Sequence, residues 1–454
     1  MKKIFIILIL SMPLLAEDSK TVSDIFKSSN ANQIVMDIEA ALARAQASQG
    51  IIPLWAAEEI TKKAEIKYMP NKEVSKEQAI VRHRLVARLN VWKRSIELGA
   101  EEYLHFGATT VDIFDTLLVI QVNQSIELLI NDLLDIEEQL LEITKNNIDT
   151  FMAGRTIGQH ALPITFGKKT STWLAENRRN IERLQHVKTK VEQSGILKGA
   201  VGTYLGLGEK AIETEALMML ELGLSKPSVA DWHGIRDVFA EYGLTLALIS
   251  KSFGRMGEEL TLLQMTEFGE TLENLGNGAV GSSTMPQKRN PRGPGNLIEA
   301  SRVIPRISEI ILDDMINSFE RDGAKSDSEI QLISIAAEDM IDAAKLMLSQ
   351  LEVNKEMMRN NLDKTKGLIL SQRVTFELGK SIGKDSANDL MHDVAMFALK
   401  NNLTLREAIK RNSKTASHFS EPELDELLNP ETYIGLAIEQ TKQIIKEIEE
   451  KRIN

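Results

Sequence analysis

Residues 111–148 read VDIFDTLLVIQVNQSIELLINDLLDIEEQLLEITKNNI, without a proline. Apolar side chains in this run recur every three, four or seven positions, which predicts one long α-helix because such positions share a helix face. They are Leu117, Leu118, Ile120, Val122, Ile126, Leu129, Leu133, Leu134, Leu140, Leu141 and Ile143. These residues spread over more than one thin stripe, so we expect the helix to be covered on most sides.

Four more stretches show the same helical spacing. The chain has only 11 prolines, and a proline inside a helix costs about 3 kcal/mol, so long proline-free regions leave room for long helices. No stretch keeps a two-residue alternation for long. Together with residues 111–148, the stretches predict an all-α fold around a bundle of long helices. They run from about 168 to 193, 234 to 268, 298 to 316 and 328 to 351.

Composition limits the chemistry of the chain. Its 454 residues are 43% hydrophobic, enough for a large core and two or three domains of a soluble globular protein. The net charge is -11 and no basic cluster appears, which argues against a nucleic-acid partner. The chain has no cysteine, so it has no disulfide, thiolate nucleophile or Cys-ligated metal. No HExxH-like spacing occurs, and we expect neither a metal nor a cofactor.

The first residues, MKKIFIILILSMPLLAEDS, have the form of a secretory signal. Two lysines precede an apolar run that is shorter than the roughly 20 residues of a membrane-spanning helix. We predict cleavage after Ala16, although Leu14 departs from the usual small residue. Residues 1–16 would then be removed, leaving an exported, periplasmic protein without a membrane anchor. The alternative is a cytoplasmic protein in which this stretch is a core helix or a misassigned start.

A stretch rich in glycine and proline interrupts the bundle and contains GSSTMPQKRNP at residues 281–291. Loops longer than about 12 to 15 residues are uncommon in compact domains, and this one is either functional or a polar linker. Its chemistry favours function. Ser282 and Ser283 offer hydroxyl and backbone NH groups to an anion, and Lys288 adds a positive charge. Such a loop could capture an anionic substrate and close over it.

This stretch fills every fixed position of the signature GSS-x-x-P-x-K-x-N. The matching residues are Gly281, Ser282, Ser283, Pro286, Lys288 and Asn290. Three further stretches match regions of the same family: HFGATTVD (105–112), GRTIGQHALPITFG (154–167) and LNPETYIG (428–435). The chain therefore resembles the fumarase/aspartase superfamily, in its adenylosuccinate lyase and 3-carboxy-cis,cis-muconate cycloisomerase branch.

The resemblance implies an all-helical protomer with three domains, at 17–108, 109–352 and 353–454. It also implies that the central bundles associate into a homotetramer, with each active site assembled from several subunits. In the family, a base removes a proton beside a carboxylate and the neighbouring bond then breaks. The first serine of the signature, here Ser282, is that base.

The doubly charged intermediate of this reaction needs fixed hydrogen-bond donors and positive charge. The candidates are Lys288, Asn290, the hydroxyls of Thr109 and Thr110, and NH groups of the loop around Ser283. In comparable sites each such donor contributes about 2.7 to 4 kcal/mol. The substrate is accordingly expected to be a small polycarboxylate.

The proton donor is less conventional. Most relatives carry histidine after the threonine of the second region, whereas Ile157 follows Thr156 here. His160 stands three residues later and, if this region is helical, shares a face with position 157, so we take it as the candidate acid.

Other residues of the site follow from the same resemblance. His83 and His105 match active-site histidines of adenylosuccinate lyases, and Thr156 and Gln159 are expected to contact substrate. The remaining histidines, His186, His233, His392 and His418, are interpreted as ordinary structural or surface groups. His233, in DWHGIRD, is expected to position a neighbouring helix.

Two features argue against a nucleotide substrate. The start of the mature chain, TVSDIFKSSN, lacks the Arg-Tyr pair of adenylosuccinate lyases, and Ile330 stands where they carry a phosphate-binding arginine. EAALARAQASQGIIP (39–53) is closer to the cycloisomerase branch.

The expected function is a lyase that eliminates the β carbon–nitrogen bond of a succinyl-type substrate and releases fumarate. One alternative is lactonisation of the 3-carboxy-cis,cis-muconate type, and another is a non-catalytic helical tetramer. Carbon–nitrogen and carbon–oxygen cleavage are not separated by these residues.

Overall fold

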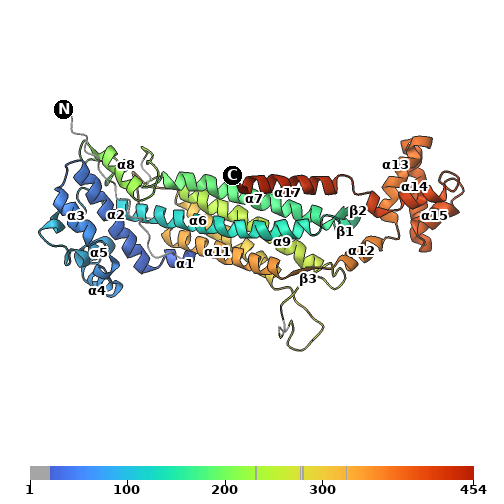
Figure 1. Ribbon diagram of the computed structural model, residues 1–454, viewed down its shortest axis with the longest axis horizontal. Helices are drawn as coiled ribbons and strands as arrows, with labels where there is room; N and C mark the ends of the chain where they lie inside the picture. The colour runs from blue at the N-terminus through green and yellow to red at the C-terminus, as the bar shows by residue number, and fades with distance from the viewer. Residues whose placement is uncertain (1–20, 231–232, 277, 279–280, 324, 454) are drawn as a thin grey trace. The chain divides into compact units, whose positions relative to one another are not determined.

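The computed structural model describes residues 21–453 except 231, 232, 277, 279, 280 and 324. The predicted signal at 1–16 lies outside these residues. Helices dominate the described part of the chain, which confirms the predicted all-α class (Figure 1). The five predicted long helices are all present, with ends a few residues from those expected. They are α6 (Thr110–Lys145), α7 (Phe166–Glu192), α9 (Asp237–Leu263), α10 (Gly293–Asp313) and α11 (Asp327–Ser349).

Helix α6 is covered as its sequence predicts. Apolar side chains at spacings of three and four are almost fully buried along it: Val119, Val122, Ile126, Leu129, Leu133, Ile136 and Leu140. Burying one such side chain stabilises the fold by roughly 1.5 to 3 kcal/mol. Hydrogen bonds between helices restrict how the helices can pack. Asn177 of α7 donates to the Leu133 carbonyl of α6 at 2.8 Å, and Tyr242 of α9 bonds Ser334 of α11 at 2.8 Å.

Among the described helices, α6 is the one long and apolar enough to cross a membrane by length and composition. Most of the apolar stretch, 67%, is buried inside the protein. This is the pattern of a core helix, which passes the same test of length and composition.

The chain divides into two compact contact units. The first comprises residues 1–132, 181–251 and 300–341, and the second 133–180, 252–299 and 342–454. The five long helices contribute residues to both units. The predicted domain limits at 108/109 and 352/353 stay a prediction.

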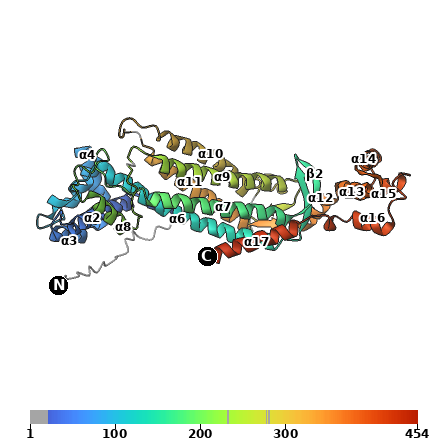
Figure 2. The same cartoon turned by 90° about the horizontal axis from the view of Figure 1, so that it is seen from above.

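Short helices of the first unit gather around α2, which packs against α3 and α8 (Figure 2). Most of α2 is buried, which is why its sequence, SSNANQIVMDIEAALARAQAS, is apolar on several sides. The bounds in this unit are α1 (Val22–Ile25), α2 (Ser28–Ser48), α3 (Leu54–Lys62), α4 (Asn71–Val81), α5 (Arg84–Lys93) and α8 (Ala211–Glu221), with single turns at Ile66–Tyr68 and Ala100–Tyr103.

The second unit contains one antiparallel hairpin and one further antiparallel strand pair that the helical interpretation did not predict. Strands β1 (Phe151–Thr156) and β2 (Gln159–Thr165) pair with a bulge after Gly154, and β3 (Thr271–Glu273) pairs with β4 (Leu351–Val353). The expectation that 157 and 160 share a helix face is therefore wrong. Ile157 and Gly158 form a two-residue turn with φ of 53° and 76°, and positive φ at both turn positions is what a tight hairpin requires.

The C-terminal helices α13, α14, α15 and α16 lie together (Figure 2) and enclose a separate apolar core in the second unit. Val374, Leu378, Met391, Val394 and Ile409 are among its buried side chains. The bounds are α12 (Lys355–Asp363), α13 (Ser371–Ile382), α14 (Lys384–Asn401), α15 (Leu405–Arg411) and α16 (Glu421–Leu427), with single turns at Leu368–Leu370 and Pro430–Thr432.

The last helix, α17 (Ala437–Ile453), lies along the second-unit half of α6. Its Arg452 bonds Glu137 at 2.9 Å and its Glu449 pairs with Lys145 at 2.6 Å.

Candidate active site

The signature loop runs from Asn274, after β3, to Arg292, before α10. Its two sides approach each other where Gly281 faces Lys288 and Asn290, and we call this part of the loop its neck. Asn290 donates from Nδ2 to the Gly281 carbonyl at 3.1 Å. A β-carbon at Gly281 would lie 2.6 Å from the carbonyl oxygen of Lys288, so the two sides of the neck can approach only because this residue is glycine. The loop thus has a defined shape between 281 and 290.

Inside the neck, Ser282 accepts a backbone hydrogen bond. The Met285 NH donates to Ser282 Oγ at 3.3 Å, and the Lys288 NH donates to the Met285 carbonyl at 2.9 Å. An NH directed at a serine oxygen stabilises negative charge on that oxygen. The geometry is compatible with the predicted base.

Side chains on the loop are available to a ligand. Ser283, Lys288 and Asn290 are exposed and Ser282 is half-buried. Lys288 has no ion-pair partner among the described residues, so its charge is not used inside the fold. Nor does any hydrogen bond or ion pair in the described part of the chain join Ser282 to His160.

Both ends of the loop are fixed next to the β3–β4 strand pair. Glu273 accepts the backbone NH groups of Arg292, at 2.9 Å, and Gly293, at 3.1 Å, and so caps the start of α10. At the other end, Asn274 donates its backbone NH to the Gln350 carbonyl at 2.8 Å. The loop therefore leaves and re-enters the protein at held positions.

The β1–β2 hairpin carries the second group of candidates, above a buried ion pair. Arg155 donates to both oxygens of Glu270, at 2.9 and 2.6 Å, and lies 4.8 Å from the centre of the Phe268 ring. Asn361 also donates to Glu270, at 2.7 Å. Glu270 is fully buried, and these bonds compensate the loss of its hydration.

His160 lies opposite Arg155 in the hairpin register. Partial burial and the positive charges of Arg155 and Lys364 hold its pKa below the usual value, although Glu270 opposes them. Its Nδ1 is buried and has no hydrogen-bond partner in the described part of the chain. His160 is therefore a neutral imidazole near pH 7, and any proton that it receives is held weakly.

Thr156, Ile157 and Gln159 lie at the tip of the same hairpin and are exposed. The Ile157 side chain is 101% exposed, although its backbone is left-handed, a conformation that is unfavourable for a β-branched residue. The hairpin places the predicted contacts Thr156 and Gln159 beside each other and directly next to His160.

In the first unit, His105 forms a pair with an acid that the sequence did not reveal. Its Nδ1 lies 2.7 Å from Oε1 of Glu39, which is fully buried in α2. Burial alone lowers the pKa of His105, but the charge and hydrogen bond of Glu39, helped by Asp112, outweigh it and raise the pKa. No described residue bonds the other nitrogen, Nε2, and the side chain is 20% exposed.

Thr109 and Thr110 lie just after His105, at the start of α6. Their side chains are half-buried, and neither hydroxyl has a hydrogen-bond partner among the described residues. Asp112 accepts the Thr109 NH at 2.9 Å and fixes the turn. The turn therefore presents two hydroxyls without described partners beside a histidine whose pKa is raised, which is a suitable environment for a carboxylate.

His83 has a structural role in the fold. It caps α5, with Nδ1 accepting the Val86 NH at 3.2 Å, and its side chain is exposed. No hydrogen bond or ion pair joins His83 to the other candidates among the described residues. Its role in substrate binding stays a prediction.

The structure adds three buried acids behind the predicted residues: Glu39, Asp112 and Glu270. The sequence partly indicates that Glu39 has a partner, because a charged residue inside the apolar stretch of α2 has to be paired when it is buried. Its partner could not be named, since Glu39 and His105 are 66 positions apart.

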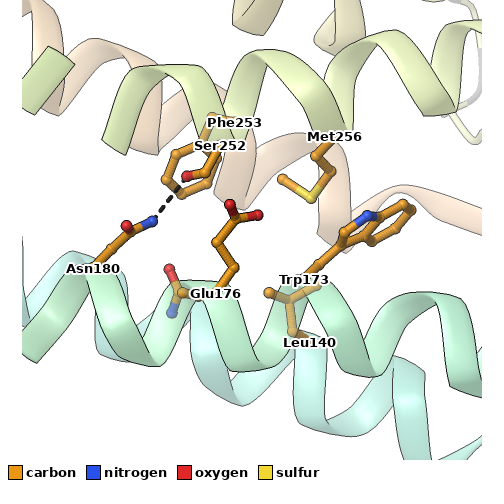
Figure 3. A pocket seen from close by; sticks show the side chains of 8 residues that line it. Leu140, Trp173, Glu176, Asn180, Ser252, Phe253 and Met256 are labelled. Carbon is orange, nitrogen blue, oxygen red and sulfur yellow. Dashed lines mark hydrogen bonds between the residues drawn. The ribbon is translucent and has the colours of Figure 1, made fainter. Parts of the chain in front are cut away.

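A small crevice lies between α6, α7 and α9 (Figure 3). None of the predicted site residues lines it, and Asn180 and Ser252 bond each other across it at 2.8 Å. Its lining consists of Leu140, Trp173, Glu176, Asn177, Asn180, Ser252, Phe253 and Met256. In the described residues, no group of three His, Asp or Glu side chains is placed to hold a metal ion.

Two protein-family models match the chain. Residues 16–305 match a family described as lyase, and residues 367–444 match the adenylosuccinate lyase C-terminus. The first match covers more than half of the chain and includes every candidate site residue.

Individual relatives are similar over nearly their full length. An adenylosuccinate lyase of Methanocaldococcus jannaschii is 35% identical over 94% of both chains. An N-acetyl-S-(2-succino)cysteine lyase of Dickeya dadantii is 33% identical over 90% of both. Among solved structures, the 3-carboxy-cis,cis-muconate lactonizing enzyme of Pseudomonas putida has a TM-score of 0.86 and 31% identity, covering 94% of this chain and 96% of its own.

Proposed function

The chain belongs to the fumarase/aspartase superfamily of lyases, and on that premise we propose that it eliminates a substituent from a succinyl-type substrate and releases fumarate. The observation that carries the proposal is the loop at 281–290. It holds the complete signature, directs a backbone NH at Ser282 Oγ and leaves Lys288 without an ion-pair partner among the described residues.

The proposed reaction is an elimination that begins at the carbon beside a carboxylate. The deprotonated oxygen of Ser282 takes a proton from the carbon beside a carboxylate, and the electron pair moves into that carboxylate. Lys288, Asn290 and the loop NH groups stabilise the extra negative charge. The pair then returns to form the double bond of fumarate as the bond to the substituent breaks. The substituent leaves with its bonding electrons and takes up a proton.

His105 and His160 have different proposed roles because their charges differ. The Glu39 pair keeps His105 protonated, so with Thr109 and Thr110 it suits a substrate carboxylate. The lowered pKa leaves His160 mostly unprotonated near pH 7, so as the proposed proton donor to the substituent it acts from its minor protonated form, which releases its proton readily. Thr156 and Gln159, beside His160, are proposed to contact the same end of the substrate.

A nucleotide is not proposed as the substituent. Ile330, where adenylosuccinate lyases carry a phosphate-binding arginine, is 0% exposed in α11 and cannot grip a phosphate. A small substituent joined through nitrogen or sulfur fits better. The Dickeya dadantii relative is named for a sulfur-linked substrate, and a thiolate, with a thiol pKa of about 8.5, leaves with little help from an acid.

Lactonisation is the second candidate. The similarity to the lactonizing enzyme of Pseudomonas putida favours it, because 94% of this chain and 96% of that chain match with a TM-score of 0.86. Both reactions would use the same base and the same charge stabilisation.

A substrate panel tests the proposal. Purified protein is incubated separately with adenylosuccinate, argininosuccinate, aspartate, malate, N-acetyl-S-(2-succino)cysteine and 3-carboxy-cis,cis-muconate, and fumarate or lactone is quantified. Fumarate from a succinyl compound supports the lyase, and lactone alone supports the cycloisomerase. Turnover of no compound favours the non-catalytic tetramer, and adenylosuccinate as the best substrate contradicts the argument from Ile330.

We also propose that the protein is a homotetramer whose sites are completed by neighbouring copies. Apolar side chains remain exposed on the long helices: Leu244 and Leu248 on α9, Val303 and Ile310 on α10, and Leu332 and Leu346 on α11. Such surfaces are usual for oligomer interfaces. Light scattering after size-exclusion chromatography tests this, since a mass of one chain would contradict it.

Export is proposed from the N-terminal sequence alone. An osmotic-shock fraction is expected to contain a chain that begins near Glu17. Full-length protein in the cytoplasmic fraction would favour the alternative.

A further inference from the structure

His233 is buried between two aspartates of α6. Its Nδ1 lies 2.7 Å from Asp115 Oδ2 and its Nε2 lies 3.0 Å from Asp112 Oδ1, and the ring is 0% exposed. An ionised carboxylate only accepts hydrogen bonds, so both ring nitrogens must donate. The ring is then a doubly protonated imidazolium. Burial alone lowers the pKa of His233, but the two aspartates outweigh it and raise the pKa.

The surrounding charges are compatible with that proton. Arg236 lies 3.4 Å from Asp115 and 3.8 Å from Asp327, and Lys325 bonds Asp115 at 2.5 Å. With Asp112, Asp115 and Asp327 ionised, the cluster has three acids against His233, Arg236 and Lys325. It is neutral only when His233 carries both protons. The nearby Lys198 and Glu215 compensate each other at 2.7 Å.

Asp112 connects this cluster to the candidate site. The oxygen that His233 contacts also accepts the NH groups of Lys198, at 2.9 Å, and Gly199, at 3.2 Å. The other oxygen accepts the Thr109 NH at 2.9 Å. Asp112 therefore holds the threonine turn and the 198–199 turn in one arrangement, and the imidazolium holds Asp112.

We propose that His233 is a positioning residue for the reaction: clamped between Asp115 and Asp112, it fixes through Asp112 the backbone of Thr109 and thus the Thr109–Thr110 hydroxyls that receive the substrate carboxylate. This rests on the proposed function in one respect, the assignment of the two threonines to substrate binding. His233 touches neither substrate nor reacting atoms. Its loss is felt in substrate binding, and it acts only while the ring is charged.

The clamp at His233 can be tested by NMR spectroscopy without a substrate. With nitrogen-15 histidine labelling, the His233 ring of the wild-type protein is expected to show two protonated nitrogens at pH 7. The backbone amide signals of Thr109 and Gly199 are expected to shift with the same midpoint as the ring when pH is raised. A neutral ring at pH 7, or amides that do not follow the ring, overturns the proposal even if no variant folds.

Kinetics supply the second measurement. His233→Gln removes the charge, and its KM is expected to rise on the order of 100-fold with a much smaller change in kcat, because a misplaced binding group weakens binding. Wild-type KM is expected to rise above the His233 midpoint and the variant KM to be flat there. His186→Gln, at an exposed histidine of α7, is the control and should match the wild type.

The outcomes separate the two claims. A variant that keeps the wild-type KM and its pH dependence overturns the clamp while leaving the lyase assignment intact. If the wild-type protein turns over no panel compound, the proposed function fails. The clamp is then judged by the amide titration alone, and amides of Thr109 and Gly199 that are unchanged in His233→Gln overturn it.

Discussion

Glu39 and His105 form a pair across 2.7 Å that joins a fully buried carboxylate of α2 to a partly exposed imidazole with its second nitrogen open. One nitrogen is held by an acid and the other is available to a ligand, which is how proteins orient a histidine for function. The pair keeps His105 charged next to Thr109 and Thr110.

Glu39→Gln is expected to remove this charge near neutral pH. The pKa of His105 is raised above its usual value of 6.5, so the pair stabilises the fold fully below that value and progressively less as pH rises through the raised pKa. The variant should lose about 1 to 3 kcal/mol of unfolding free energy on the acidic side and lack this decline. Urea unfolding at several pH values measures both effects.

The pKa of His233 is also raised, so its protonation contributes to the pH dependence of stability as well. The relevant quantity is therefore the difference in unfolding free energy between wild type and variant at each pH. His105→Asn removes the other half of the pair and should abolish the same difference. A constant difference across pH would mean that His105 is not charged by Glu39.

Lys288→Met is expected to reduce kcat by a factor of about 100 to 1,000, because one fixed donor to a developing negative charge is lost. The melting temperature should not change, since Lys288 is exposed and has no ion-pair partner among the described residues. Arg289→Met, at the neighbouring exposed cation, is the matched control. Equal losses in both variants would show that general loop charge, and not Lys288, matters.

Gly281→Ala should abolish turnover while leaving the unfolding free energy nearly unchanged. Its new β-carbon would lie 2.6 Å from the Lys288 carbonyl, so the neck has to open and Ser282 and Lys288 move apart. Gly295→Ala is the control, because no atom lies within 4 Å of the added carbon there. Full activity in Gly281→Ala would show that the closed neck is dispensable.

Ile157→Asn is expected to raise the unfolding free energy by about 1 kcal/mol. Asparagine tolerates the left-handed turn with φ of 53° better than isoleucine does, and no packing is lost from a side chain that is 101% exposed. Denaturant unfolding measures the gain. A destabilised variant would indicate that Ile157 packs against a neighbouring copy.

Long helices could be predicted because each carries its own spacing signal. The 151–165 hairpin could not, since its strands are short and its turn contains Ile157, which is a poor residue for positive φ. The neighbouring Gly158 was the one available hint.

The candidate residues on the loop and the candidate histidines were predictable from motifs. Their protonation states and ion-pair partners were not. His105 is charged because of Glu39, 66 residues away, and Arg155 is neutralised by Glu270, 115 residues away. Such pairs depend on how distant segments meet, which local sequence does not specify.

Fumarate release by wild type, Ser282→Ala and Thr284→Ala, measured side by side on the best panel substrate, tests the central claim most directly. Thr284 is exposed in the same loop and serves as the control. The account predicts that Ser282→Ala loses at least about 1,000-fold in kcat while remaining folded, and that Thr284→Ala keeps near wild-type turnover. Undiminished turnover in Ser282→Ala would contradict it.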